Sequence, residues 1–137
     1  MIRPRAISDV IATVQYAAEH DLAIHPRGSG SGVAGESIGP GLVLDFSRYM
    51  QRITPSDDPA KVTVQSGVML ADLNRTLRSG GRAGDDERWF GPDPMTRSIT
   101  TMGSVLATNA SGSHYLRSGA ARDTIESMRV VTVDGEL

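Results

Sequence analysis

The chain has no cysteine, few aromatic residues and no long hydrophobic run, and each absence excludes a class of protein. Without cysteine, the 137 residues contain no disulfide, no catalytic thiol, no iron–sulfur ligand and no cysteine-based zinc site. No apolar run approaches the roughly 20 residues of a membrane-spanning helix, and residues 1–6 do not form a signal peptide. A net charge of −2 does not favour nucleic acid as a partner. We therefore expect a soluble, cytoplasmic protein that at most associates with the surface of the inner membrane.

Aliphatic residues and glycine dominate what is present. Hydrophobic residues make up 39% of the chain and aromatic residues only 4%, so the core must be built from Val, Leu, Ile, Ala and Met. The 15 glycines cluster beside apolar runs, which indicates tight backbone geometry at several places. His20, His25 and His114 are scattered, and no pair has the spacing of metal ligands on one helix face. We expect no metal site.

The periodicity of apolar residues predicts helices alternating with strands. Three helices are predicted: over 10–20 after a cap at Ser8 or Asp9, over 70–77 before a stop at Gly80-Gly81, and over 102–106 after a cap at Thr100 or Thr101. Strands are predicted over 22–25, 42–46, 61–65 and 128–133.

The end of the chain predicts that the sequence is a fragment. Asp134-Gly135 after an apolar run is a hairpin signal, but only Glu136 and Leu137 follow it. The returning strand is therefore missing, and an unpaired strand edge is a liability for a domain. We expect a piece of a longer protein.

Residues 26–35, Pro-Arg-Gly-Ser-Gly-Ser-Gly-Val-Ala-Gly, are the most informative stretch of the chain. Their glycines reach positive φ at little cost and let a ligand approach the main chain. Successive free N–H groups in such a loop form a nest for an anion, commonly a phosphate. The loop indicates a nucleotide or dinucleotide cofactor, or else a glycine-rich turn that binds nothing.

The residues of this loop can be compared with three known sequence motifs. Residues 30–35 satisfy G-x-G-x-x-G, but the turn at 39–41 comes too early for the helix of a Rossmann fold, and Asp45 is only fifteen residues after Gly30. No lysine follows the glycines, which excludes a P-loop. Residues 35–39 match G-x-S-x-G but lie between a loop and a turn, so we interpret this as a chance match to the hydrolase motif.

A second segment, residues 98–113, is rich in hydroxyl groups and small side chains. Small side chains let a flat ligand lie against the chain, and Thr, Ser and Asn offer hydrogen bonds without charge. Alone, the segment is a capped helix and a loop; with the glycine loop, it predicts two walls of one cofactor site. The charged run 85–88 is typical of a solvated loop. Trp89 and Phe90 are packing residues or rings that flank a ligand.

These segments together resemble the FAD-binding domain of the vanillyl-alcohol oxidase and p-cresol methylhydroxylase type. The matching stretches are PRGSGSGVAGESIGPGLVLDFSRYMQRI (26–53), VTVQSGVMLADLNRTL (62–77), FGPDPMTRSITTMGSVLATNASGSHYLRSGAARD (90–123) and VVTVDGE (130–136). The similarity is strongest to the glycolate oxidase and D-lactate dehydrogenase flavoproteins, including large enzymes with an iron–sulfur domain such as D-2-hydroxyglutarate dehydrogenases.

The resemblance implies a truncated α+β fold in which two subdomains clamp an extended FAD. Residues 1–137 would be a partial FAD-binding domain, with a small parallel βα subdomain over about 1–55 and the beginning of a larger, mainly antiparallel subdomain over about 60–137. The substrate domain would be absent. The residues implied to hold the cofactor are Pro26, Arg27, Gly28, Ser29, Gly30, Ser31, Gly32, Pro94, Thr96, Ser98, Thr100, Thr101, Gly103, Thr108, Asn109, Ala110, Ser111 and Gly112.

Two positions depart from the family's pattern. Some relatives attach flavin through a histidine in the glycine loop, but Ser31 stands at that place, which implies non-covalent FAD. The family usually has two glycines where this chain has Gly103 and Ser104, so Ser104 adds a side chain close to the predicted flavin.

The activity implied by the resemblance is oxidation of a small 2-hydroxy acid, of the glycolate, D-lactate or D-2-hydroxyglutarate type, by hydride transfer to FAD. The catalytic residues would belong to the absent substrate domain, and any iron–sulfur cluster to another absent part of the parent protein. The electron acceptor and the oligomeric state are left open, a homo-oligomer included. Two alternatives also stay open: a flavoenzyme similar to UDP-N-acetylenolpyruvoylglucosamine reductase, and a non-catalytic module that retains the fold.

Overall fold

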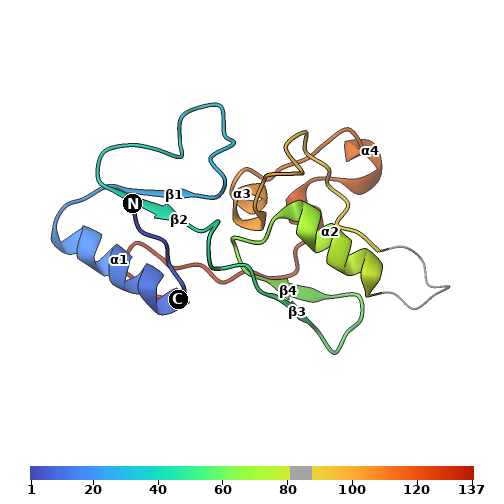
Figure 1. The fold of residues 1–137 in the computed structure, drawn as a ribbon, viewed down its shortest axis with the longest axis horizontal. Coiled ribbons are helices and arrows are strands. Elements are labelled where there is room, and N and C mark those ends of the chain that lie inside the picture. Colours follow the sequence, from blue (N-terminus) through green and yellow to red (C-terminus); the bar gives the residue numbers. More distant parts are fainter. Residues whose placement is uncertain (81–87) are drawn as a thin grey trace.

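Two small sheets, each with helices packed beside it, organise the chain (Figure 1). The computed structural model describes residues 1–80 and 88–137. Gly81 of the predicted helix stop and residues 85–87 of the charged run lie outside the described residues. The elements in chain order are α1 Ile7–Glu19, β1 Ile24–Arg27, β2 Leu42–Asp45, β3 Ile53–Pro55, β4 Val62–Val64, α2 Leu70–Ser79, α3 Met102–Ala107, α4 Tyr115–Ser118 and the 3₁₀ helix η1 Ala121–Thr124.

The first sheet is a parallel pair that carries the glycine loop between its strands. β1 and β2 pair in register from Ile24 opposite Leu42 to Arg27 opposite Asp45. The connection is the loop over residues 28–41, and α1 lies against the pair (Figure 1). Leu44 is buried on β2 and Ala17 on α1, so the apolar face of the helix covers the sheet.

Helix α1 begins earlier than its sequence predicts. The carboxylate of Asp9 accepts hydrogen bonds from the backbone N–H groups of Arg5 (2.7 Å) and Ala6 (3.1 Å), which lie before the first turn. These bonds satisfy donors at the helix start, and a negative side chain there also favours the helix dipole. The predicted cap at Ser8 or Asp9 is therefore wrong, because Asp9 acts from within the first turn.

The second sheet is an antiparallel pair that packs against the main hydrophobic core. β3 and β4 pair from Ile53 opposite Val64 to Pro55 opposite Val62, and β3 was not predicted from the sequence. The buried core beside them comes from α2, α3, η1 and the segment before α2. Its members are Val68, Leu70, Leu73, Met102, Val105 and Ala121.

Two predicted helix boundaries in this half are confirmed. Helix α2 ends where the N–H of Gly80 donates to the carbonyl oxygen of Thr76 at 3.0 Å. Helix α3 begins after Thr101, whose side-chain hydroxyl accepts a long hydrogen bond from the N–H of Ser104 at 3.4 Å. A threonine in this role satisfies one of the free donors of the first turn. The start of α3 is thus set by a local signal.

The predicted strand over 128–133 is wrong. In the described part of the chain this stretch pairs with no strand, because an apolar run has no ladder hydrogen bonds without a neighbour. The turn at its end does form: the N–H of Thr132 donates to the carbonyl oxygen of Glu136 at 2.8 Å, and Gly135 has a φ of 76°. Figure 1 shows this segment returning from α4 and η1 to α1, where Gly135 lies against Gln15.

Candidate cofactor site

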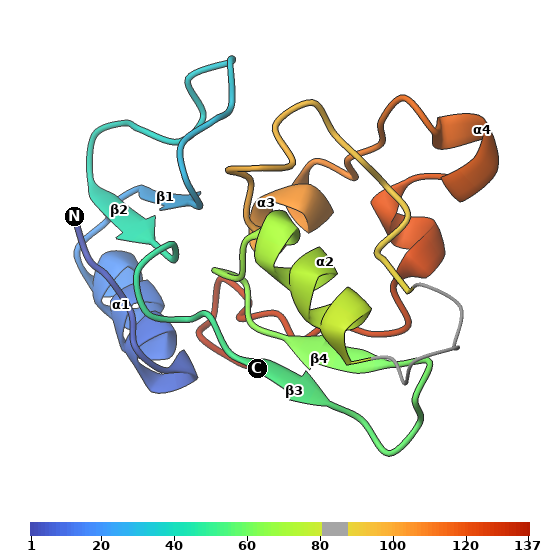
Figure 2. The ribbon, with the colours of Figure 1, turned by 45° about the vertical axis from the view of Figure 1, so that its right-hand side comes forward.

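The glycine loop meets the threonine-rich segment where β1 ends and α3 begins (Figure 2). Gly28 is buried there, and a Cβ atom built on it would overlap the side chain of Thr101 and lie 2.6 Å from Oγ of Ser104. No side chain fits in that space without displacing these groups. The two predicted walls therefore share a contact, which we call the Gly28 junction: Gly28, Thr101 and Ser104.

Beyond Gly28 the loop leaves its amide groups unused. In the described residues, the N–H groups of residues 29–32 donate no hydrogen bond to the protein. Gly30 has a φ of 73°, a left-handed conformation that other residues rarely adopt. Consecutive free amides around such a glycine form a concave anion site. The backbone of the loop therefore offers donors to a negatively charged group.

Arg27 places a positive charge against the same loop. Its Nη2 donates to the carbonyl oxygen of Ser29 at 3.1 Å and its Nε to that of Gly28 at 3.4 Å. The guanidinium also lies against Cα of Gly30. A guanidinium held beside free amides strengthens the attraction for a phosphate or carboxylate.

Ser29 supplies a test of whether a ligand belongs in the loop. Its Oγ atom is buried and has no hydrogen-bond partner within the described chain. A buried hydroxyl left without a partner costs on the order of 1–3 kcal/mol, so such groups normally have a partner. A diphosphate oxygen would be that partner. The free amides, Arg27 and this hydroxyl are donors of the kind that a diphosphate needs, and the carboxylate of Glu36 lies against Gly32 in the same loop.

In the second wall, backbone N–H groups are hydrogen-bonded within the protein rather than free. The N–H groups of Met102 and Gly103 donate to the carbonyl oxygens of Val68 and Ser66, both at 2.8 Å. A Cβ atom on Gly103 would lie 3.0 Å from Ser66, so the missing side chain permits this approach. These amides are already used inside the protein. The wall therefore has no amide nest at Met102 and Gly103, and Thr100 and Thr101 beside them are buried, at 4% and 1% exposed.

Ser104 belongs to the site, although it was not among the predicted binding residues. Its Oγ lies 3.1 Å from Oγ1 of Thr101, and both oxygens lie against Gly28. The sequence held a signal for this pairing, because residues three apart at a helix start come together in capping arrangements. The side chain at this departure from the family's glycine pair lies against the glycine loop.

The other predicted residues of the second wall lie in two turns and a loop. The N–H of Arg97 donates to the carbonyl of Pro94 (2.8 Å) and that of Thr100 to the carbonyl of Thr96 (2.9 Å), and the side chain of Ser98 is exposed at the outer turn. Gly112 packs against Asp93, whose Oδ2 lies 2.7 Å from Nδ1 of His114.

The residues just after α3 form hydrogen bonds and contacts with other residues of the second half of the chain. The hydroxyl of Thr108 donates to the carbonyl of Ser104 at 2.8 Å, and Oδ1 of Asn109 accepts from the N–H of Arg122 at 3.1 Å. Ala110 packs on the core, whereas Ser111 is exposed. Their contact with the cofactor stays a prediction. The structure brings the two walls together at the Gly28 junction.

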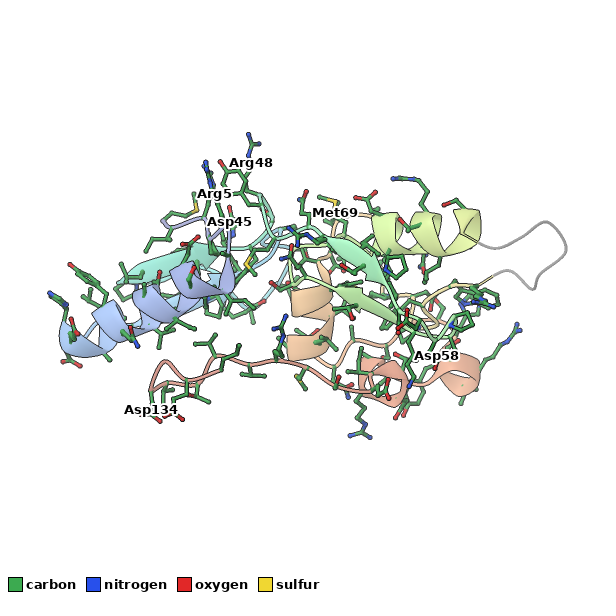
Figure 3. The ribbon with its side chains drawn as sticks, turned by 90° about the horizontal axis from the view of Figure 1, so that it is seen from below. Arg5, Asp45, Arg48, Asp58, Met69 and Asp134 are labelled. Carbon is green, nitrogen blue, oxygen red and sulfur yellow. The ribbon has the colours of Figure 1, made fainter. Side chains whose placement is uncertain are left out.

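Asp45 adds a fixed negative charge at the end of β2 (Figure 3), where its backbone pairs with that of Arg27 on β1. Burial raises the pKa of this carboxyl, but hydrogen bonds from the hydroxyl (2.6 Å) and N–H (3.0 Å) of Ser47 and from Arg3 lower it, helped by the charge of Arg27. The net effect is a pKa below the ordinary 3.8. Asp45 is therefore ionised at neutral pH and balances Arg27.

A parallel strand pair joined by an anion-binding loop, closed by a wall of small residues, defines a dinucleotide-binding domain that is not of the Rossmann type. Comparison with known families matches residues 1–137 to the family described as "FAD binding domain". The chain belongs to this family, which confirms FAD as the cofactor predicted for the site.

Relatives of known name share the whole length of the chain. It is 30% identical over 141 residues to D-2-hydroxyglutarate dehydrogenase of Escherichia coli (strain K12), covering 100% of the chain and 13% of that relative. It is 30% identical over 139 residues to glycolate oxidase subunit GlcD of Bacillus subtilis (strain 168), covering 100% of the chain and 28% of that relative. The chain thus spans a small part of these relatives.

The fold also matches the solved structure of an oxidase. Xylooligosaccharide oxidase from Myceliophthora thermophila C1 in complex with xylobiose superposes with a TM-score of 0.84 at 25% identity, over 98% of this chain and 27% of the other. The predicted α+β class, truncated relative to such proteins, is confirmed. Among the described residues no group of His, Asp or Glu is arranged to hold a metal. None of the helices in residues 1–80 and 88–137 has the length and apolar character to cross a membrane.

Proposed function

We propose that the protein carrying this chain is an FAD-dependent dehydrogenase or oxidase of a small 2-hydroxy acid. The names of relatives that match the whole chain support this substrate class, which includes glycolate, D-lactate and D-2-hydroxyglutarate. The Gly28 junction carries the proposal, because it joins a loop with free amides to a wall of small, hydroxyl-bearing residues. The composition supports a cytoplasmic location.

The chain's own contribution is to bind and orient the cofactor. The amides of residues 29–32, the guanidinium of Arg27 and the hydroxyl of Ser29 would hold the diphosphate. The hydroxyls of Thr101 and Ser104 would face the flavin side of the loop. When bound, FAD supplies the hydride acceptor, and the protein's part is positioning and electrostatic tuning. Ser31 offers no group for covalent attachment, so the proposal is of non-covalent FAD.

The proposal also concerns the organisation of the protein. A small parallel subdomain over about 1–55 and the beginning of an antiparallel one over about 60–137 would make up the chain. The parallel pair β1–β2 supports the first subdomain, but β3 at its end pairs antiparallel with β4 of the second. Because the relatives are several times longer, the base and the substrate-binding groups lie outside this chain.

A charge placed in the nest tests the proposal. Gly30→Asp puts a carboxylate beside Arg27 at a φ of 73°, where it takes the place of the phosphate. Gly35→Asp is the matched control, since Gly35 has a φ of 79° and no atom within 4 Å of its added Cβ. Both variants carry a similar backbone strain and the same added charge, so they differ in position and in the contact of the new side chain with Arg27.

The readout is the visible spectrum of protein incubated with FAD and desalted. The starting protein and Gly35→Asp should retain a flavin band, and Gly30→Asp should lose it. Substrate class is then read by flavin bleaching with glycolate, D-lactate or D-2-hydroxyglutarate, and by NADPH oxidation as the contrasting reductase assay. Loss of the band in both variants, or in neither, would count against the nest as the diphosphate site.

A further inference from the structure

We propose that a second, arginine-lined cleft in this domain binds a small organic polyanion, carrying carboxylate or phosphate groups, apart from the glycine loop. The cleft has a volume of about 880 Å³ and lies between α2, the segment 89–98 and α4. Figure 2 shows this segment, in yellow, running between α2 and α4. Its lining does not include Gly28, Thr101 or Ser104, and Ser98 is the one predicted cofactor residue among the described residues that line it.

Positive charge is concentrated in the cleft. Arg75, Arg97 and Arg117 line it, as does Arg78, which has an interaction partner of its own, and Asp93 is the single carboxylate among the described lining residues. Nδ1 of His114 lies 2.7 Å from the carboxylate of Asp93, so that carboxylate already has a partner. The chain as a whole carries a net charge of −2, so this surface is opposite in sign to the average. A concave surface of one sign attracts small ions of the other.

Two of these arginines have a guanidinium group that makes no hydrogen bond or ion pair in the described part of the chain: Arg97 and Arg117, both exposed. The charge of Arg97 does help to lower the pKa of Asp93. Arg117 instead lies over the ring of Trp89 at 6.0 Å. Arg75 contacts Asp72 through Nη1 only, which leaves its other donors for a ligand. Planar guanidinium groups bind carboxylate and phosphate oxygens in pairs.

The walls of the cleft are set by the fold rather than by the arginines. Oδ1 of Asn74 on α2 accepts a hydrogen bond from the N–H of Phe90 at 2.7 Å, which ties the segment 89–98 to the helix. Asp93 accepts from the N–H of His114 at 3.2 Å, which ties the same segment to the loop before α4. The arginines therefore extend from three elements that are held together without them.

The geometry indicates the class of ligand. Arg97 and Arg117 come from different elements, so a ligand that satisfies both carries at least two anionic groups. A volume of this size accepts an organic molecule and not merely a single inorganic ion. The exposed indole of Trp89, 45% accessible, offers a flat apolar surface to its carbon skeleton.

Calorimetric titration of the purified, FAD-treated protein with citrate and with pyrophosphate tests the cleft. The double variant Arg97→Gln/Arg117→Gln should weaken the better-bound anion by about tenfold or more, because two charge-assisted contacts are lost. The matched control Arg48→Gln/Arg129→Gln removes the same charge outside the cleft and should weaken binding by less than about twofold. Tighter binding of citrate identifies a polycarboxylate, and tighter binding of pyrophosphate a phosphate compound.

Three results would overturn the proposal. They are failure of both anions to bind, equal weakening by the two double variants, and loss of FAD together with loss of anion binding in the cleft variant. The near-ultraviolet circular dichroism of each variant shows whether it is folded, and Arg97→Lys/Arg117→Lys serves as a milder pair if the glutamine pair unfolds. The titration measures anion binding and not reduction of the flavin, so its outcome is independent of the proposed function.

Discussion

Replacing Gly28 by alanine is the most direct test of the Gly28 junction. The residue does not have a positive φ, so alanine brings no backbone strain and the effect comes from contact alone. The added Cβ would overlap Thr101 and lie 2.6 Å from Oγ of Ser104. Forcing one carbon into a packed site costs about 1–3 kcal/mol of unfolding free energy. We expect that loss in urea unfolding, and weaker binding of FAD, because the loop would shift away from Thr101 and Ser104.

A double-mutant cycle tests whether the overlap with Thr101 causes this loss of stability. Thr101→Ala removes the atoms that the new Cβ would meet first, but it also removes the cap of α3, which costs about 1 kcal/mol. The two changes together should then cost less than their sum, by at least about 0.5 kcal/mol. Gly80→Ala, at a φ of −83° with its nearest neighbour 3.3 Å from the added Cβ, is the control and should change stability by less than 1 kcal/mol. Additive costs, or an unchanged Gly28→Ala protein, would refute the junction.

Two further predictions concern the supports of the site. Leu73→Ala in the buried core should lower the free energy of unfolding by about 2–5 kcal/mol, measured in urea, because it leaves a cavity. Asp45→Asn should cost about 1–3 kcal/mol at pH 7, since it weakens the charge-assisted bonds from Ser47 and Arg3. The folded pKa of Asp45 is lowered, so its contribution is present above the ordinary pKa of 3.8 and disappears as the pH falls through the folded value.

Their controls are an exposed leucine for Leu73 and a change of pH for Asp45. Leu116→Ala removes a fully exposed leucine and should leave stability within about 0.5 kcal/mol of the starting value; an equal loss at both leucines would contradict the core assignment. For Asp45, unfolding curves at several pH values should converge with those of Asp45→Asn in acid. A gap that stays constant down to pH 3 would show that the carboxylate's charge is not responsible.

Helix ends can be predicted from the sequence where they depend on residues that are close together in the chain. The cap at Thr101 and the stop at Gly80 lie where predicted, because each depends on residues within one helical turn. Strand β3 escaped prediction, since its three residues include Pro55 and show no clear alternation. The run 128–133 was predicted as a strand from composition, but a strand also requires a partner, which composition does not provide.

The sequence alone determined that the chain holds a glycine-rich anion loop and a hydroxyl-rich segment in the order of an FAD-binding domain. Backbone freedom and side-chain size are properties of each residue, and they can be read without coordinates. Only the tertiary structure decided that Gly28 lies against Thr101 and Ser104, that the Oγ atom of Ser29 is buried without a partner, and that arginines from three elements line one cleft. Those facts join residues far apart in the chain, and their distances depend on how helices and sheets pack rather than on any local preference.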